Sequence, residues 1–329
     1  MRILVIRLSS IGDILLTTPI LRALRTTFQD AEIDYLTKPN FIPLLERNPA
    51  LTSIFTTEKF EPKRRYELIV DLQHSFVSSK YHRWGEKVVC YQKENWKKFL
   101  LVNFKMNLYR GYESVVERYA KSLATFGVKL DEKGGEVFLS GEEIEFGKSY
   151  CKAETPVLAV CFGARHFTKR FPPERFAGAL NRLLEKKSIE VWLLGGKEDS
   201  PIADKIMSTV RSKVNVKNFA GRHNLRETAT MLASADAVLT NDTGLMHMAA
   251  ALQKPMVVLF GSSVKAFGFL PYKAAYQLLE VEGLRCRPCS HIGREGCPKS
   301  HFKCMNDISE ERLVGAVEDA LKQSMISKK

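Results

Sequence analysis

Hydrophobic and polar positions follow two periods along this chain. Short apolar runs of strand length, bounded by polar turns, alternate with segments in which apolar residues recur every three to four positions. Strands are predicted at 3–8, 32–36, 68–72, 87–91, 156–161, 189–194, 237–240 and 255–260. Helices are predicted from the turn at 9–13 to about 28, and at 141–152, 175–184, 226–233 and about 309–323. This alternation indicates an α/β architecture with parallel sheets.

The alternation falls into two units. The chain has 329 residues, which is long for one domain and fits two domains of ordinary size. A polar stretch at 131–135 and the helix at 141–152 separate the first set of strands from the second. We therefore expect an N-terminal domain at 1–152 and a C-terminal domain at 153–329, each with its own core.

Composition and charge narrow the class of protein. No apolar run approaches the roughly 18 residues of a membrane span. The opening residues meet a charge too early for a signal peptide, so they are predicted to form a strand in a cytoplasmic protein. Lys and Arg outnumber Asp and Glu by 50 to 37, a net charge of +13. Such an excess favours an anionic partner, whether nucleotide, nucleic acid or acidic lipid headgroup.

The first candidate site is the loop that follows the first strand. In doubly wound sheets ligands bind beyond the carboxyl ends of the strands, so this loop faces a possible cleft. It contains Ser9, Ser10, Gly12 and Asp13. Gly12 lets the backbone approach a ligand, and Asp13 is a candidate general base. The alternative is that Asp13 only caps the following helix.

The second candidate site is the loop at 241–244, which opens an apolar helix. A helix N-terminus presents free N–H groups and partial positive charge, which suits a diphosphate. Asp242 would repel phosphate, so it is predicted to orient the turn and cap the helix. Thr243 and the local amides would then meet the ligand, Gly244 would permit close contact, and His247 follows one turn later. A purely structural N-cap is the alternative.

Two further loops follow strands of the second unit. Lys169 and Arg170 could neutralise charge that develops on a departing diphosphate, or they belong to a solvated basic loop. Glu198 could accept hydrogen bonds from ribose hydroxyls, or it lies in a plain turn. The fingerprints GxGxxG and GxxxxGK[ST] are both missing from the sequence, so neither a dinucleotide dehydrogenase nor a P-loop enzyme is indicated.

Four motifs in this order resemble glycosyltransferase family 9, the ADP-heptose lipopolysaccharide heptosyltransferases. They are Arg7–Pro19, Lys169–Pro172, Phe219–Gly221 and Asn241–His247, and they span both halves of the chain. The resemblance implies a GT-B fold, in which two Rossmann-like domains with parallel sheets face each other across a cleft. It assigns the acceptor to the N-terminal domain and the nucleotide-sugar donor to the C-terminal domain. It also implies inversion at the anomeric carbon without a catalytic metal or a cofactor.

The resemblance also implies roles for individual residues. Asp13 matches the general base, Lys169 the lysine that faces the donor phosphates, and Glu198 an acidic donor contact. Near Gly163 several members carry Ser or Thr beside the phosphates, whereas this chain has Ala164 and Arg165. The remaining matched positions are the donor diphosphate loop, Asp242, Thr243, Gly244 and His247, and the acceptor-side loop, Ser9, Ser10 and Gly12.

The implied partners are ADP-heptose and an anionic lipid A core, either Kdo-lipid A or heptosyl-Kdo-lipid A. The enzyme would act at the cytoplasmic face of the inner membrane in peripheral contact with it. Transfer of another nucleotide-sugar and a GT-B-type sugar-nucleotide epimerase are the alternatives within this fold. A nucleic-acid-binding protein is the alternative from another class, but no recognition motif supports it, and we predict no nucleic-acid partner.

Four of the seven cysteines lie close together in the sequence, at Cys286, Cys289, Cys297 and Cys304. Their spacing could ligate zinc, with His291 and His301 nearby. Similar cysteine-rich tails occur in heptosyltransferase II-like members, which favours that subfamily. Because the cytoplasm is reducing, we predict reduced thiols in a folded loop and no metal site. Residues 40–130 carry no motif that identifies an acceptor pocket.

Overall fold

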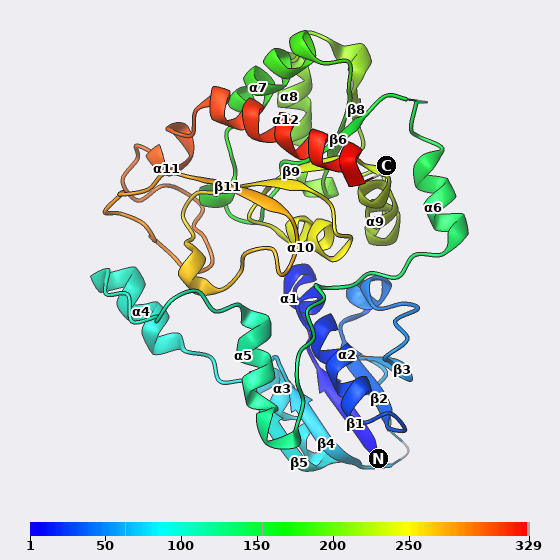
Figure 1. The fold of residues 1–329 in the computed structure, drawn as a ribbon. Coiled ribbons are helices and arrows are strands. Elements are labelled where there is room, and N and C mark those ends of the chain that lie inside the picture. The colour runs from blue at the N-terminus through cyan, green and yellow to red at the C-terminus, as the bar shows by residue number, and fades with distance from the viewer. Residues whose placement is uncertain (63, 153, 328–329) are drawn as a thin grey trace.

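A computed structural model describes residues 1–62, 64–152 and 154–327. It contains two parallel sheets, one in each half of the molecule (Figure 1). The prediction of an α/β protein with two Rossmann-like halves is confirmed. The strands of the first sheet are β1 (Arg2–Ile6), β2 (Glu32–Thr37), β3 (Ser53–Thr56), β4 (Tyr66–Asp71) and β5 (Gly85–Cys90). Those of the second are β6 (Val157–Cys161), β7 (Glu190–Leu194), β8 (Val216–Asn218), β9 (Ala237–Asn241), β10 (Met256–Phe260) and β11 (Tyr276–Glu280).

The strand orders show where a ligand should bind. The first sheet has the order β3-β2-β1-β4-β5, and the second has β11-β10-β9-β6-β7-β8. In each sheet the chain starts in the middle, builds outward in one direction, and then returns to build the other side. The order therefore reverses between β1 and β4 and between β6 and β9. Ligands of doubly wound sheets bind at the carboxyl ends of the strands on either side of such a reversal.

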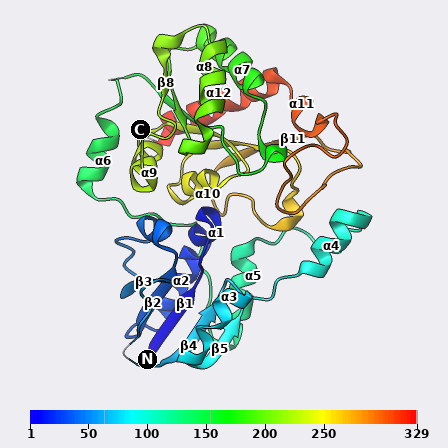
Figure 2. The same cartoon turned by 180° about the vertical axis from the view of Figure 1, so that it is seen from behind.

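Twelve α-helices occur among the described residues, and Figures 1 and 2 show them around the two sheets. In the first half these are α1 (Ile11–Leu15), α2 (Thr18–Thr27), α3 (Phe76–Ser79), α4 (Asn95–Phe104) and α5 (Val115–Ser122). The others are α6 (Gly141–Lys148), α7 (Pro173–Lys186), α8 (Ser200–Thr209), α9 (Leu225–Ser234), α10 (Gly244–Ala251), α11 (Lys303–Asn306) and α12 (Glu310–Ser327). None of the described helices is both long and apolar enough to span a bilayer.

The first predicted helix is interrupted. One continuous helix to about residue 28 was expected, but α1 ends at Leu15 and α2 begins at Thr18. Pro19 lies in the first turn of α2, where a helix needs no N–H donor, so it starts this second helix instead of continuing the first. Between the two helices, the Thr17 hydroxyl donates a hydrogen bond to the Ile14 carbonyl oxygen at 2.6 Å.

The segment before the expected domain boundary packs with the second half. The Arg226 guanidinium, on α9, pairs with the Glu143 carboxylate, on α6, at 2.5 Å. A Cβ on Gly147 of α6 would lie 2.5 Å from the Thr230 carbonyl oxygen of α9. Helix α6 therefore lies beside α9 in both views (Figures 1 and 2). The division into 1–152 and 153–329 stays a prediction, and residues 153, 328 and 329 lie outside the described part of the chain.

The central strands are buried on both faces. Every residue of β6, β7, β9 and β10 is buried, and so are Ile3–Ile6 of β1. Helices cover both sides of parallel sheets, which explains why these strands are continuous apolar runs in the sequence. The polar residues that follow them are left at the carboxyl ends, where the two sheets approach each other.

Candidate active site

Helices α1 and α10 bring the two strand-order reversals together. A Cβ on Gly12 of α1 would lie 2.4 Å from Cδ2 of His247 on α10. A Cβ on Gly244 of α10 would lie 2.7 Å from the Ile11 Cβ of α1. Real Cβ atoms do not approach other atoms this closely, so glycine is needed at both positions for the two helices to make this contact. The first turns of two helices from different halves therefore lie directly against each other (Figure 1).

The Asp13 carboxylate is held by Arg7 and Ser10. Arg7 Nη2 lies 2.7 Å from Asp13 Oδ1, and the Ser10 hydroxyl and backbone N–H donate to Asp13 Oδ2 at 2.8 and 3.2 Å. Burial raises the pKa of Asp13, but the Arg7 charge and the Ser10 hydrogen bonds outweigh burial and hold the pKa below its ordinary value. Ser10, not Asp13, is the N-cap of α1; Asp13 lies at the third position of the helix, accepts from the backbone N–H of that cap residue, and is an ionised carboxylate.

Arg7 was missed as a site residue. The sequence shows only a cation at the end of a strand, but the structure buries it to 8% exposure and surrounds it with acceptors. Its Nε donates to the Ser9 carbonyl at 2.9 Å and its Nη1 to the Leu72 carbonyl at 2.6 Å. Arg7 therefore joins the loops after β1 and β4 and fixes the direction in which Asp13 points. Ser9 acts through its backbone, and Ser10 is exposed at the site.

Lys169 and Asp242 form the other side of the site. Lys169 follows β6 and Asp242 follows β9, and their Nζ and Oδ2 atoms lie 2.8 Å apart. The Ser263 hydroxyl also donates to Asp242 Oδ2. Burial raises the pKa of Asp242, but Lys169 and the hydrogen bonds outweigh it and the pKa is lowered. The carboxylate is therefore ionised and holds the Lys169 ammonium in place.

The prediction that Asp242 caps α10 is wrong. The N-cap of α10 is Thr243, in extended conformation, and no side chain caps the helix there. Asp242 points instead to Lys169 and Ser263, because their ion pair and hydrogen bond neutralise its charge. The first N–H groups of α10 are thus free of side-chain acceptors, as a helix terminus that receives an anion requires.

His247 lies between the two sides. It is buried, and its Nδ1 has no hydrogen-bond partner within the described part of the chain. Burial is the main cause that lowers its pKa to about 4, although the Asp242 and Asp13 carboxylates raise it. The imidazole is therefore neutral near pH 7. Since both carboxylates act on this ring, the loops after β1 and β9 lie within electrostatic reach of each other.

Glu198 occupies a different environment from these residues. It is exposed in the turn after β7, and a Cβ on Gly196 would lie 2.5 Å from its Oε2. The neighbouring Asp199 is buried instead, and its Oδ2 accepts from the Gly196 N–H at 3.1 Å. A Cβ on Gly163, after β6, would lie 2.2 Å from the same Asp199 oxygen. The exposed Glu198 carboxylate is thus accessible to a ligand, while Asp199 packs between the loops that follow β6 and β7.

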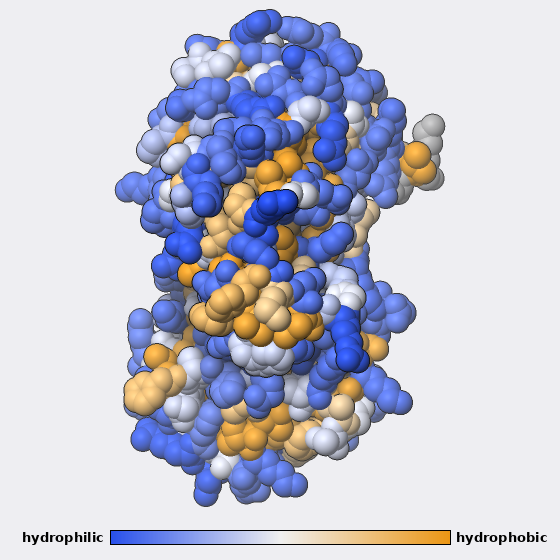
Figure 3. Space-filling view, turned by 90° about the vertical axis from the view of Figure 1, so that its left-hand side faces the viewer, coloured by the Kyte–Doolittle hydropathy of each residue, from blue (hydrophilic) through white to orange (hydrophobic). Residues whose placement is uncertain are grey.

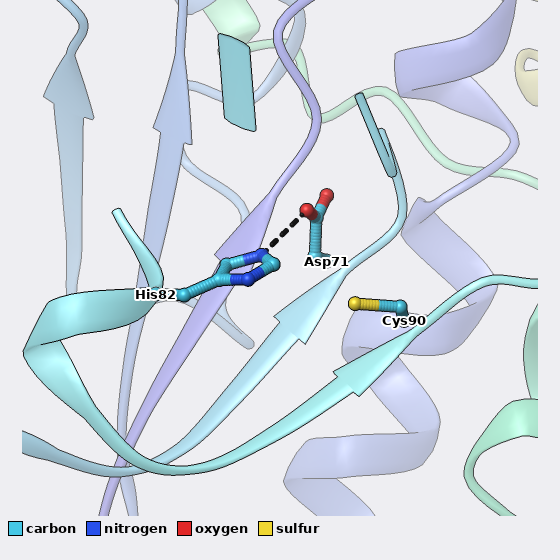
Figure 4. A group of neighbouring side chains, drawn as sticks. All are labelled: Asp71, His82 and Cys90. Atoms are coloured by element: carbon cyan, nitrogen blue, oxygen red, sulfur yellow. Dashed lines mark hydrogen bonds and ion pairs between the residues drawn. The ribbon is translucent and has the colours of Figure 1, made fainter. Parts of the chain in front are cut away.

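A second polar cluster lies at the carboxyl ends of β4 and β5. Asp71 and Cys90 are register partners, and ligand atoms of Asp71, His82 and Cys90 lie within 4.8 Å of one another (Figure 4). Asp71 is fully buried, and Oδ2 accepts from His82 Nε2 at 2.8 Å. Its Oδ1 accepts from the N–H groups of Gln73 and His74 at 2.9 and 2.7 Å. Because both oxygens are used, Asp71 organises the turn that supplies the Leu72 carbonyl to Arg7.

The cysteine-rich loop borders the site on the side of Lys169. The Thr168 hydroxyl accepts from the Arg294 N–H at 2.9 Å, and His166 Nδ1 lies 2.8 Å from Glu295 Oε1. All seven cysteines are free thiols. In the described residues, no three ligand atoms of this loop lie within 4.8 Å of one another. The expectation that this loop holds no metal stays a prediction.

Comparison with known proteins places this geometry in a family. The profile of glycosyltransferase family 9 (heptosyltransferase) matches residues 62–297, more than half of the chain. The lipooligosaccharide heptosyltransferase 2 of Haemophilus influenzae is 27% identical over 79% of this chain and 83% of its own length. The structure of Escherichia coli ADP-heptose LPS heptosyltransferase II covers 99% of this chain and 100% of its own, with 22% identity and a TM-score of 0.76. That of a family 9 glycosyltransferase from Veillonella parvula covers 98% and 97%, with 21% identity and a TM-score of 0.79. The chain therefore belongs to glycosyltransferase family 9 and is a glycosyltransferase.

Proposed function

We propose that this enzyme transfers a heptose from ADP-heptose to the inner core of lipopolysaccharide, in the manner of a heptosyltransferase II. Relatives that resemble it are named lipooligosaccharide or lipopolysaccharide heptosyltransferase 2, and one solved structure is named ADP-heptose LPS heptosyltransferase II. The observation that carries the proposal is the contact between α1 and α10, which sets the Asp13 carboxylate opposite the Lys169 loop and the N-terminus of α10. A base on one side and anion-binding groups on the other suit a displacement at the carbon between them.

In the proposed reaction the acceptor hydroxyl lies against Asp13. Its oxygen forms a bond to the anomeric carbon as the bond to the ADP oxygen breaks, and the hydroxyl proton passes to the Asp13 carboxylate. A single displacement from the opposite face inverts the anomeric centre. Since Arg7 keeps Asp13 ionised, the base is ready at neutral pH, and it takes the proton only as the attacking oxygen becomes acidic.

The leaving diphosphate would meet Lys169 and the free N–H groups at the start of α10. Thr243 and Gly244 form this helix start, and Glu198 is proposed to contact the donor from the turn after β7. These groups stabilise the negative charge that grows on ADP as the glycosidic bond breaks. The Asp242 carboxylate sets the position of Lys169 and need not itself touch phosphate. His247 remains neutral and adds no charge between the two sides.

We assign the acceptor to the first sheet and the donor to the second, with the division near residue 152. The acceptor is an anionic, lipid-anchored core, so the enzyme works at the cytoplasmic face of the inner membrane. The net charge of +13 favours both anionic substrates.

The test is transfer from ADP-heptose to a purified, heptose-deficient lipid A core, followed by mass spectrometry. A product heavier by one heptose, with inverted anomeric configuration by NMR, supports the proposal. ADP-glucose and UDP-sugars serve as control donors, and transfer from them should give little product. Isomerisation of the nucleotide-sugar without acceptor would contradict transfer and indicate an epimerase.

A further inference from the structure

The segment 95–112, made of α4 and the stretch that follows it, carries an exposed apolar surface. Helix α4 extends away from the body of the molecule toward the side of the cysteine-rich loop (Figures 1 and 2). Trp96, Phe99 and Phe104 are 59%, 58% and 61% exposed. The stretch after the helix adds three further exposed side chains, Met106, Leu108 and Tyr112.

The exposed aromatic side chains of α4 lie close together. Trp96 and Phe99 lie on one side of α4, because residues three positions apart share a helix face. The rings of Phe99 and Phe104 lie 5.9 Å apart, while Leu101 alone among the helix residues is buried against the protein. Figure 3 shows hydrophobic residues gathered in the middle of this face, with polar residues around them. Patches of this kind mark interaction sites.

The side chains around this surface are mostly cationic, which favours an anionic partner. Residues 95–112 contain four cations, Lys97, Lys98, Lys105 and Arg110, and neither Asp nor Glu, although Lys97 pairs with the flanking Glu94. Next to the end of α4 a cavity of about 590 Å³ is lined by further cations, and carboxylates are missing from its lining residues. Exposed Trp and Phe side chains beside Lys and Arg are typical of segments that lie in the interface of an anionic bilayer.

We infer that the segment 95–112 docks the enzyme on an anionic membrane surface, with Trp96, Phe99 and Phe104 inserted among the lipids. The inference rests on the proposed function, because a lipid-anchored acceptor must be met at a bilayer. The segment contacts the cysteine-rich loop, which in turn contacts the candidate active site. Lys105 Nζ donates to the Pro288 carbonyl of the cysteine-rich loop at 2.6 Å, and that loop contacts Thr168 next to Lys169. Docking through α4 therefore holds the cleft beside the membrane.

Vesicle flotation tests this inference with the full chain. The native enzyme is mixed with phosphatidylcholine vesicles and with vesicles that also contain phosphatidylglycerol, at low and high salt. It should bind the anionic vesicles, and salt should weaken binding. The variant Phe99→Glu/Phe104→Glu should lose binding by about tenfold or more, since each inserted aromatic ring contributes a large apolar area. Both positions are exposed, so folding should be retained and circular dichroism confirms it.

A matched control separates this surface from general effects of charge. The variant Val214→Glu/Ile326→Glu makes the same change at two positions that are each 75% exposed. Val214 lies just before β8 and Ile326 lies near the end of α12, and Figure 1 shows β8 and the C-terminal end of the chain on the other side of the molecule from α4. It should bind vesicles like the native enzyme. Equal binding by the α4 variant and the native chain would overturn the inference. So would a native chain that ignores vesicles and forms dimers that the α4 substitutions dissociate, because α4 would then contact a second copy.

Transfer to a water-soluble, deacylated core distinguishes this inference from the proposed function. The α4 variant should transfer heptose to the soluble acceptor at the native rate and lose activity only on acceptor embedded in vesicles. If the native enzyme binds anionic vesicles through α4 but transfers heptose to neither acceptor, the proposed function fails while the docking surface stands. A variant that loses activity on both acceptors would contradict a role limited to docking.

Discussion

The Arg7 guanidinium and the Asp13 carboxylate form an ion pair of 2.7 Å at the carboxyl end of β1, and Arg7 is more deeply buried than its partner. Arg7 also donates to the carbonyls of Ser9 and Leu72, so the cation is fixed from both neighbouring loops. The carboxylate at the centre of the site therefore has a set direction and charge before any substrate arrives.

Replacing Arg7 with Met should move the pH dependence of transfer. Without the guanidinium, burial dominates and the pKa of Asp13 rises. Because the base must be ionised, the acid limb of the kcat/KM profile should shift to higher pH. Arg2→Met is the control, since Arg2 lies at the opposite end of β1 and pairs with Glu32. A profile that is unchanged in Arg7→Met would show that Arg7 does not tune the base.

Gly12→Ala should separate α1 from α10. The added Cβ would lie 2.4 Å from the His247 ring, so the helices must shift, at a cost of about 1–3 kcal/mol in the free energy of unfolding. Transfer should fall with it, because the two sides of the site move apart. Gly315→Ala in α12 is the matched control: its Cβ would meet nothing within 4 Å, and stability should be unchanged or slightly higher. Urea unfolding and transfer rates measure both effects.

Lys169→Met should reduce stability and donor affinity together, but for separate reasons. The buried Asp242 carboxylate would lose its partner, which costs about 3 kcal/mol. Adding Asp242→Asn removes the unpaired charge, so stability should largely return while affinity for ADP-heptose stays low. Calorimetric binding and chemical unfolding of the single and double variants separate the two. Recovery of donor affinity in the double variant would mean that Lys169 does not contact the donor.

His247 should make stability depend on pH in weak acid. Its pKa is lowered to about 4 in the folded chain, whereas an unfolded histidine titrates near 6.5. Between these values the unfolded state binds the extra proton. The free energy of unfolding should thus fall by about 1.4 kcal/mol per unit as pH decreases from 6.5 towards 4. His247→Gln should lack this contribution, while exposed His301→Gln should retain it. Parallel slopes in native and His247→Gln proteins would refute the buried neutral imidazole.

The strands that position the site were predictable because burial on both faces makes them continuous apolar runs, as in β1, β6, β9 and β10. The edge strands β3, β8 and β11 were missed because they are short or partly exposed and lack that signal. The loops that carry Asp13, Lys169 and Asp242 could be predicted as site loops because ligands of parallel sheets bind at the carboxyl ends of the strands. Arg7 and Asp71 were not, since their roles depend on contacts between strands that are distant in sequence. Asp242 was misassigned as a cap because its partner Lys169 lies 73 positions earlier.

The role of Asp13 as the base is tested by comparing the native enzyme with Asp13→Asn in single-turnover transfer from ADP-heptose to the heptose-deficient lipid A core. The substitution keeps the shape of the side chain and removes the base. The variant should bind ADP-heptose with native affinity and transfer heptose about 100-fold or more slowly. Transfer by Asp13→Asn at the native rate would rule out this role, because the reaction would then need no base at the end of β1.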